Sequence, residues 1–341
     1  MKLYTNETIS VTTIICVLLI IVGVVGNMLI IWTFHKSKHL RVRVNVFVVS
    51  LAVVDLLIVS YLLPFNIVIL QTNWKLKPAI LCTINGIIAP VLFMSSIQYI
   101  MLISLSRYVK IRHPQIFDTL FSPTKITLFI ICCLLLTISL QIPLLSHDVD
   151  HHFIFDESLH MCIFNRHGDR MYSAVCIILG LFLPILTTSL CYVKLYYFII
   201  ESRRNCFKCS NIRLARRKLK EQQTSTRTQF SVFIACLVLY FPFGLTCLFQ
   251  HNQFPDYFHS VSIYFAFANS CINSVLYGVM NSNIRKEYMR VFRCIPKQRR
   301  KSFTVHAKLK YRINEYSQQQ MCEFDNEICI AGRTWNRYET Q

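Results

Sequence analysis

An acidic side chain deep inside an apolar stretch, Asp55, is the first candidate for chemistry in this sequence of 341 residues. Other apolar stretches carry isolated polar residues that could reach it: Asn27, Ser96, Asn269, Ser270 and Asn273. A carboxylate among hydroxyl and amide oxygens suits a small hard cation such as Na⁺, or alternatively a proton. The same residues could instead form a buried hydrogen-bond network that only holds helices together. The residues alone leave these alternatives open.

Two of the 15 cysteines lie where they could form a covalent bond. Cys82 comes at the start of the third apolar run, and Cys162 lies in the polar segment before the fifth. An oxidising extracellular environment would favour a disulfide between them, and two unpaired cysteines are the alternative. Most other cysteines lie within apolar runs, where a free cysteine behaves as a small hydrophobic residue.

Seven apolar runs must position these residues. A membrane-spanning helix needs about 20 mostly apolar residues. The runs that qualify are roughly 9–34, 44–69, 81–108, 126–145, 172–200, 230–249 and 257–280. Hydrophobic residues make up 54% of the chain and charged residues only 16%, whereas a soluble domain carries about 25% charged residues. The sequence therefore predicts an all-α membrane protein, a seven-transmembrane helix bundle.

The placement of Lys and Arg predicts the orientation of the bundle. The net charge of +19 could indicate nucleic-acid binding, but the basic residues lie between the apolar runs, so we expect no nucleic-acid partner. One side of the membrane carries only five of the 36 basic residues: Lys2, Lys75, Lys77, Arg166 and Arg170. Because basic residues stay on the cytosolic side, we expect a multi-pass plasma-membrane protein with an extracellular N-terminus and a cytoplasmic C-terminus.

The apolar runs and the predicted orientation divide the chain into four parts. They are an extracellular N-terminus at 1–8, the bundle at 9–282, a short amphipathic cytoplasmic helix at 283–293 and a cytoplasmic tail at 294–341. The amphipathic helix should lie along membrane lipids. Asn6 begins a glycosylation sequon, and Cys294 directly after the amphipathic helix is a candidate for palmitoylation.

Short motifs along the seven runs resemble those of rhodopsin-like (class A) G-protein-coupled receptors. In chain order they are Gly26-Asn27, 51–55, Trp74, Cys82, Ser106-Arg107-Tyr108, Cys162, Pro184 with Tyr192, Phe241-Pro242-Phe243 and 273–277. Within this class, the segments 45–52, 269–278 and 283–288 are similar to melatonin receptors and their invertebrate relatives. The resemblance covers about residues 10–293.

The resemblance implies a receptor that passes an extracellular signal, from a small molecule or a peptide, to a heterotrimeric G protein. By analogy the G protein is of the inhibitory class, and arrestin and receptor kinases are further partners. It also implies the Cys82–Cys162 disulfide. It assigns coupling and switching to Arg107, Tyr108, Tyr192, Tyr240, Pro242, Asn273 and Tyr277. We expect no cofactor other than an allosteric Na⁺ at Asp55.

Several positions depart from the family pattern. Tyr240 replaces the usual Trp of the switch, Ser274 replaces a Pro, and Ser106 replaces the acid before Arg107, which predicts signalling without an agonist. The candidate ligand-pocket residues are Ala89, Phe164, Arg166, Gly180, Tyr240 and Phe267. Ala89 replaces the Asp of amine receptors, Gly180 the His of melatonin receptors and Phe267 the Lys of opsins.

These departures exclude an amine receptor and an ordinary light sensor, and they leave the ligand open on a melatonin-receptor-like scaffold. An orphan receptor for a peptide or lipid is the alternative. An ion channel or transporter is disfavoured because conduction needs polar residues along several spans, and only Asp55 offers an acid. We expect no enzyme, since the sequence shows no nucleophile with a neighbouring base.

Overall fold

A computed structural model describes residues 6–37, 43–72, 79–141, 153–156, 159–164, 170–205, 212–248 and 254–292. They belong to one unit, Met1–Arg293; a second unit, Cys294–Gln341, lies outside the described residues. Trp74 and two predicted site residues, Arg166 and Cys294, also lie outside them. Of Asn6 and Phe164, only the backbone is described.

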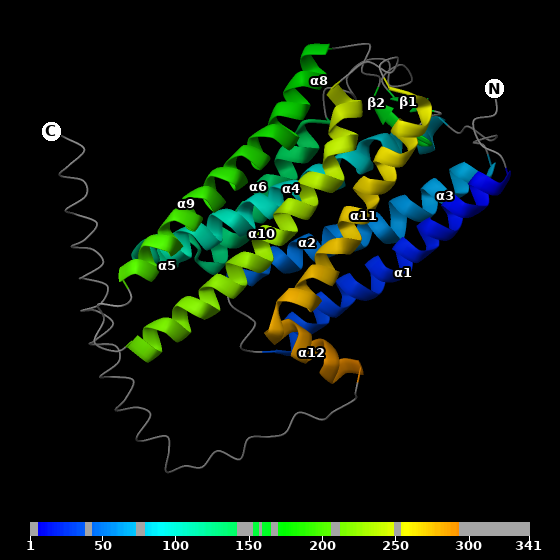
Figure 1. Ribbon diagram of the computed structural model, residues 1–341. Coiled ribbons are helices and arrows are strands. Elements are labelled where there is room, and N and C mark those ends of the chain that lie inside the picture. Colours follow the sequence, from blue (N-terminus) through cyan, green and yellow to red (C-terminus); the bar gives the residue numbers. More distant parts are fainter. Residues whose placement is uncertain are drawn as a thin grey trace. The chain divides into compact units, whose positions relative to one another are not determined.

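Helices form nearly all of the described chain (Figure 1). They are α1 (Asn6–Lys36), α2 (Asn45–Leu57), α3 (Leu63–Thr72), α4 (Ala79–Arg112), α5 (Pro114–Leu120), α6 (Pro123–Ser139), α8 (Arg170–Ile177), α9 (Leu183–Asn205), α10 (Ile212–Leu248), α11 (Asp256–Met280) and α12 (Ser282–Phe292). The long helices are apolar over most of their length, and a helix satisfies its own backbone polar groups in lipid. These helices run beside one another as a bundle.

Two single-turn π-helices interrupt the predicted spans. The first, η2 (Ile58–Leu62), joins α2 to α3 three residues after Asp55, and the second, η4 (Ile178–Phe182), joins α8 to α9 and contains Gly180. Such π-bulges are frequent at functional sites because they re-aim the side chains beside them. Both therefore occur beside residues that the sequence selected as site candidates.

Six spans are each long and apolar enough to cross a membrane unaided. The fourth predicted run forms α6, which has only 17 residues and passes the same test only together with α5, across a bend of 69°. Each of these two helices begins with a proline, Pro114 and Pro123, which lacks an N–H and therefore favours a helix start over a helix interior. The described residues thus contain seven spans when this bent pair is counted as one.

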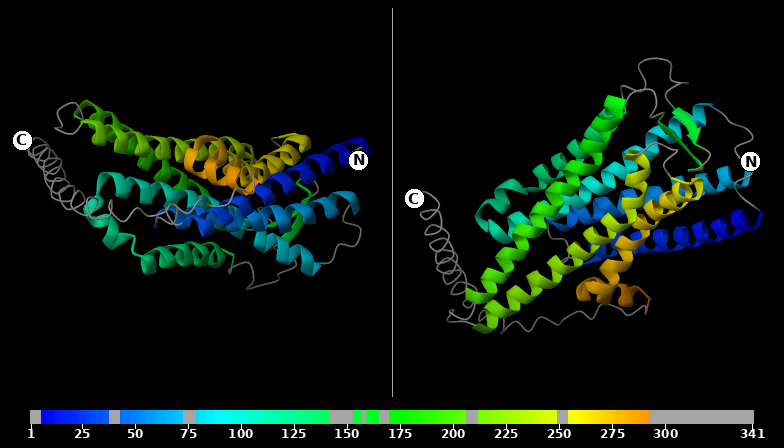
Figure 2. Two further views of the ribbon diagram at one scale, coloured as in Figure 1. Left: turned by 90° about the horizontal axis from the view of Figure 1, so that it is seen from below. Right: turned by 45° about the horizontal axis from the view of Figure 1, so that its top comes forward.

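The first and last spans approach each other closely. A Cβ atom on Gly26 of α1 would overlap the Oγ atom of Ser274 in α11. Small residues allow membrane helices to approach and to gain packing contacts. After α11 the chain turns into α12, which leaves the direction of α11 (Figure 2). Ile284 of α12 is buried, whereas Arg285 and Lys286 are exposed, so α12 is amphipathic.

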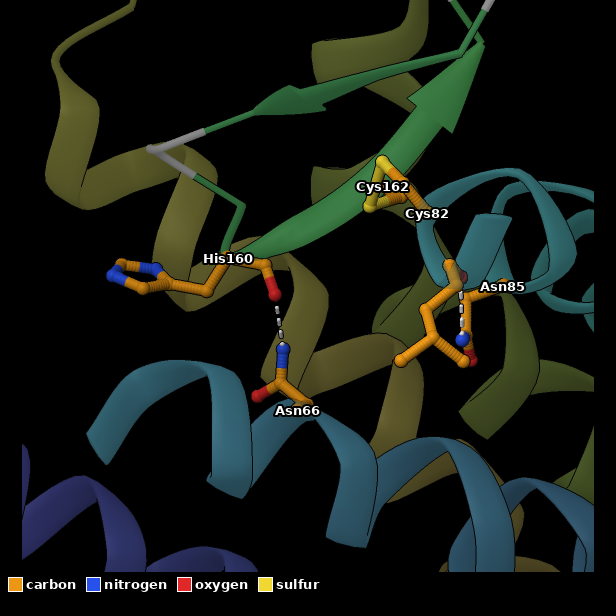
Figure 3. Close-up of a disulfide and its surroundings, with 6 residues drawn as sticks. Asn66, Cys82, Asn85, His160 and Cys162 are labelled. Atoms are coloured by element: carbon orange, nitrogen blue, oxygen red, sulfur yellow. Dashed lines mark hydrogen bonds between the residues drawn. A yellow bond between two sulfur atoms is a disulfide. The ribbon is translucent and has the colours of Figure 1, made fainter. Parts of the chain in front are cut away.

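A β-hairpin lies over one end of the bundle. Strands β1 (Phe153–Asp156) and β2 (Met161–Phe164) pair antiparallel, with Phe153 opposite Phe164. The predicted disulfide is confirmed: Cys82 in the first turn of α4 is bonded to Cys162 in β2 (Figure 3). We call this the disulfide end, and we call the end that holds the last residues of α1 and α4 together with α12 the opposite end.

The hairpin turn is also fixed to the bundle by hydrogen bonds. Asn66 of α3 donates its side-chain amide to the carbonyl oxygen of His160 at 2.8 Å, and it accepts a hydrogen bond from the Tyr264 hydroxyl of α11 at 3.3 Å. Leu159 and Met161, on either side of His160, are buried. The hairpin is therefore packed into the bundle, where its position depends on α3, α4 and α11.

Candidate functional site

Asp55 lies at the meeting point of three helices. Its side chain in α2 is fully buried. Its Oδ2 atom accepts a hydrogen bond from Asn273 Nδ2 of α11 at 2.8 Å, and its Oδ1 atom accepts one from Ser96 Oγ of α4 at 3.3 Å. A buried carboxylate is stable only with such partners. Asp55 therefore joins α2, α4 and α11 near the middle of the bundle.

The other members of the predicted network are nearby but less well bonded. Asn27 donates its side-chain amide to the carbonyl oxygens of Gly23 and Ser270, both at 2.9 Å, and so joins α1 to α11. Four groups of this network are buried without a hydrogen-bond partner among the described residues: the Asn27 side-chain oxygen, the Asn269 side-chain amide, the Ser270 hydroxyl and the Asn273 side-chain oxygen. Buried polar atoms without a protein partner indicate a place that can bind water or an ion.

An aromatic cluster lies between α4, α10 and α11, and Phe93 of α4 is at its centre. The Phe93 ring centroid is 6.2 Å from that of Tyr240, 5.6 Å from that of Phe267 and 6.2 Å from that of Phe243. Ala89, one helical turn before Phe93, is also buried. Three of the candidate pocket residues, Ala89, Tyr240 and Phe267, are therefore brought to one place, and none of them carries a charge.

The fourth pocket candidate, Gly180, lies against α4. A Cβ atom on Gly180 would be 2.6 Å from the sulfur of Met94, which is closer than van der Waals contact permits. The Met94 side chain therefore takes the space that a larger residue at position 180 would need. Beside Gly180, the shape of the candidate pocket is therefore set by a side chain of α4 and not by η4.

Tyr240 connects the aromatic cluster to the polar network. Its side chain is buried beside Ser96 and Asn269, within electrostatic reach of Asp55. Its hydroxyl makes no hydrogen bond of normal length within the described residues. The Tyr240 ring contacts Phe93, and its hydroxyl faces the polar network. A rotation of the Tyr240 side chain would therefore change contacts in both the aromatic cluster and the polar network.

At the opposite end, Arg107 of α4 lies between aromatic hydroxyl groups. Its Nη2 atom donates to the Asn45 side-chain oxygen of α2 at 3.3 Å, and Tyr192 and Tyr277 lie close to its charge. Ser106 cannot restrain it, because the Ser106 hydroxyl bonds the carbonyl oxygen of Ile103 in its own helix at 2.9 Å. Within the described ranges, no ion pair involves Arg107.

The two tyrosines beside Arg107 have different surroundings. Tyr277 donates its hydroxyl to Gln229 Oε1 of α10 at 3.0 Å. Tyr192 packs its ring against Phe230 and Phe233, at centroid distances of 5.4 and 5.5 Å, and its hydroxyl has no partner in the described part of the chain. The middle of α10 is therefore joined to α11 by this hydrogen bond and to α9 by these ring contacts.

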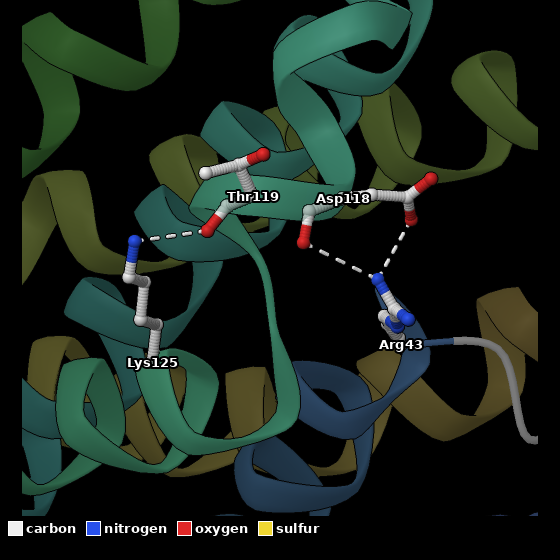
Figure 4. Close-up of polar contacts among 4 residues, drawn as sticks. All are labelled: Arg43, Asp118, Thr119 and Lys125. Atoms are coloured by element: carbon white, nitrogen blue, oxygen red, sulfur yellow. Dashed lines mark hydrogen bonds and ion pairs between the residues drawn. The ribbon is translucent and has the colours of Figure 1, made fainter.

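The segment after Arg107 is fixed by aromatic and ionic contacts. The ring centroids of Tyr108 and His113 are 5.8 Å apart. Partial burial lowers the pKa of His113, and the neighbouring charge of Arg112 lowers this pKa further. Arg43 forms an ion pair with Asp118 of α5 at 2.7 Å (Figure 4). This pair is exposed, so it orients α5 more than it stabilises the fold.

Comparison with known proteins decides the family. Residues 26–277 match the family model described as the 7 transmembrane receptor (rhodopsin family). The chain belongs to this family. It is 28% identical to the melatonin receptor type 1A of Mus musculus over 286 residues, which cover 81% of this chain and 78% of that protein. It is also 28% identical to the melatonin receptor type 1A-A of Danio rerio, with 82% and 81% covered.

The fold agrees with the family. A crystal structure of squid rhodopsin superimposes with a TM-score of 0.76 and 20% identity, over 86% of this chain and 87% of that one. The predicted seven-transmembrane helix bundle is confirmed, and so is the resemblance based on short motifs. The protein is a G-protein-coupled receptor of the rhodopsin family with a melatonin-receptor-like scaffold.

The receptor also contains site residues that sequence reasoning missed. Phe93 and Met94 are the clearest, and Phe93 could have been found because it is four residues after Ala89 and so shares its helix face. Gln229, the partner of Tyr277, carried no comparable signal. Pro242 lies within the continuous helix α10, two residues after Tyr240, where it removes one backbone donor from the helix.

Proposed function

We propose that this receptor carries a signal from the outer face of the plasma membrane, at the disulfide end, to a heterotrimeric G protein at the opposite end. The position of Arg107 carries the proposal. It lies 25 residues after Cys82 on the same helix, which corresponds to about 38 Å along the axis. At this end Arg107 has no carboxylate partner among the described residues and is flanked by two tyrosines.

The orientation is supported by the charges of the two ends. Arg43, Lys110, Arg112, Lys125 and Lys286 all belong to the opposite end, as the positive-inside rule requires of a cytoplasmic face. The disulfide belongs to the other end, where an oxidising compartment preserves it. Both features favour an extracellular N-terminus and a cytoplasmic C-terminus.

The ligand should act on the aromatic cluster around Phe93. Its side chains are apolar or carry only a hydroxyl, which favours a small, mostly apolar molecule over a cationic amine. Melatonin belongs in a screen because the relatives are named melatonin receptors. Because Met94 fills the space beside Gly180, we expect a ligand whose shape differs from that of the ligand of those receptors. A peptide or lipid is the other candidate class.

Agonist binding would shift an existing equilibrium between two arrangements of the bundle. Pro242 weakens the backbone of α10, so the part of α10 before Pro242, which carries Gln229, can move outward as a lever. Arg107 would then meet the G protein, with Tyr192 and Tyr277 rearranging beside it. By analogy we expect a G protein of the inhibitory class, with receptor kinases and arrestin acting afterwards.

The surroundings of Asp55 fit an allosteric Na⁺. A carboxylate, the Ser96 hydroxyl and the unpartnered oxygens of Ser270 and Asn273 form a hard donor set. A bound cation would neutralise Asp55 and hold α2, α4 and α11 in the resting arrangement. A proton on Asp55 is the alternative occupant.

We expect Na⁺ to lower agonist-free signalling through this site. Replacing Na⁺ by N-methylglucamine should raise basal nucleotide exchange on the G protein by about fivefold, the low end of usual allosteric coupling. Asp55→Asn should remove the dependence on Na⁺, because the amide has no charge for the cation to neutralise. Equal basal exchange in both salts, or sodium sensitivity that survives in Asp55→Asn, would contradict this role.

The proposed function is tested by basal signalling. Without an acid at position 106, the resting state lacks an ion pair worth about 1–2 kcal/mol more than a hydrogen bond. We therefore expect second-messenger changes and nucleotide exchange above those of mock-transfected cells, strongest with inhibitory-class G proteins. Ser106→Asp should lower this basal signal, because the new carboxylate would pair with Arg107.

Ser106→Ala is the matched control for this experiment. It removes only a hydroxyl that bonds the carbonyl oxygen of Ile103, so the basal signal should stay as in the wild type. The proposal fails if the wild type signals no more than mock-transfected cells with every G-protein class and Ser106→Asp changes nothing.

A further inference from the structure

A buried hydrogen bond joins α10 to α11 at the opposite end. The Tyr277 hydroxyl donates to Gln229 Oε1 at 3.0 Å, and the two residues are 1% and 5% exposed. Both side chains are therefore shielded from solvent and lipid. A buried polar group that loses its partner suffers the full penalty of desolvation, so this bond favours the arrangement in which both residues remain together.

Arg107 does not provide such a link. Its hydrogen bond leads to Asn45 of α2, and the neighbouring Ser106 bonds within α4. Neither residue ties α4 to α10 by an ion pair within the described residues. The restraint on the part of α10 before Pro242 must therefore come from other contacts. The hydrogen bond between Gln229 and Tyr277 is one such contact, and it is directional.

The position of Gln229 on α10 makes this bond sensitive to movement. Gln229 is 13 residues before Pro242, which places it about 20 Å along the helix from the proline. A tilt of α10 about Pro242 moves Gln229 by several ångströms for even a small angle. A hydrogen bond is lost when its atoms separate by much less than that, so an outward movement of α10 breaks it.

We propose that Gln229 is a positioning residue for Tyr277, whose hydroxyl it holds against α10 until α10 moves. This inference rests on the proposed function, because the movement of α10 matters only if it exposes Arg107 to a G protein. The Nε atom of Arg107 is buried and has no hydrogen-bond partner among the described residues. Tyr277 lies close to this guanidinium while it is still bonded to Gln229, so the bond restrains α10 and does not separate Tyr277 from Arg107.

The test compares three variants of the full-length receptor: Gln229→Leu, which removes the acceptor at similar size, Tyr277→Phe, which removes one oxygen atom, and the two combined. Each single variant should raise agonist-free nucleotide exchange by about three- to tenfold, the effect of one buried hydrogen bond. The combined variant should give no further increase, because both substitutions remove the same bond. Increases that multiply in the combined variant would overturn the inference.

Gln98→Leu is the matched control. Gln98 of α4 is 1% exposed, and both of its amide atoms lack a partner within the described residues. The same substitution there removes a buried amide without breaking a bond between helices, so basal exchange should stay as in the wild type. An equal increase in Gln98→Leu would show a general effect of losing a buried amide and would overturn the inference.

A readout without a G protein separates this inference from the proposed function. A fluorescent unnatural amino acid at Arg227, an exposed position on α10, should report the movement of this helix in purified receptor. We expect its emission to shift in Gln229→Leu and Tyr277→Phe but not in Gln98→Leu. A shift without nucleotide exchange would support the positioning role and count against G-protein coupling. Unchanged emission and exchange in folded Tyr277→Phe would overturn the positioning role.

Discussion

Arg107→Ala is expected to abolish G-protein activation and to leave the bundle folded. In the structure Arg107 makes one hydrogen bond, to Asn45 at 3.3 Å, and no ion pair among the described residues, so its removal should change the free energy of unfolding little. Docking of a G protein against the Arg107 charge would be strongly weakened. Removing one member of a desolvated charge contact costs about 2–5 kcal/mol, which lowers nucleotide exchange by roughly 30-fold or more.

Arg112→Ala is the control for this prediction. Arg112 belongs to the last turn of α4 and is exposed, and its guanidinium lies 5.2 Å from the centroid of the Phe198 ring. The Arg112→Ala variant should keep nearly full nucleotide exchange, because the charge of Arg112 is exposed. Nucleotide exchange that survives in Arg107→Ala, with surface expression equal to that of the wild type, would show that the G protein does not use Arg107.

Cys82→Ser and Cys162→Ser are each expected to destabilise the receptor strongly. The disulfide joins residues that are 80 positions apart, and removing a native disulfide typically costs about 2–5 kcal/mol. Without it, the hairpin is held to the bundle mainly by packing of its apolar side chains and by the bond from Asn66 to His160. We expect a lower Tm for the purified receptor and a large loss of receptor at the cell surface.

An epitope at the N-terminus, stained on cells that have not been permeabilised, measures this loss and the orientation together. Cys132→Ser is the control, since Cys132 is a free cysteine exposed on α6. It should reach the surface as the wild type does. Wild-type Tm in both disulfide variants would show that the hairpin packs without the bond. Staining of the wild type only after permeabilisation would reverse the proposed orientation.

Much of the site could be selected from the sequence. Asp55 was identifiable because an acid in an apolar span is costly and is kept only for a reason. Arg107 and the Cys82–Cys162 pair were identifiable from motifs in a fixed order. The predicted limits of the spans were less exact: the fourth run was placed at 126–145, whereas α6 covers Pro123–Ser139. Hydropathy locates the apolar centre of a span, but prolines and loop contacts set where the helix begins and ends.

The partners of the selected residues were harder to predict. The sequence proposed six residues for the polar network, and the structure shows Asp55 bonded to Ser96 and Asn273, with no bond from the Asn269 amide within the described residues. Met94 fills the space beside Gly180, and Gln229 bonds Tyr277. None of these pairs is close in the sequence, and no local pattern links their members.

The sequence by itself determined that this chain crosses a membrane and which of its residues are unusual there. These are local properties, since about 20 apolar residues in a row are enough to favour a helix in lipid. Only the tertiary structure decided which polar groups meet. The rotation and depth of each helix follow from how side chains of several helices pack together, and no single span contains that information.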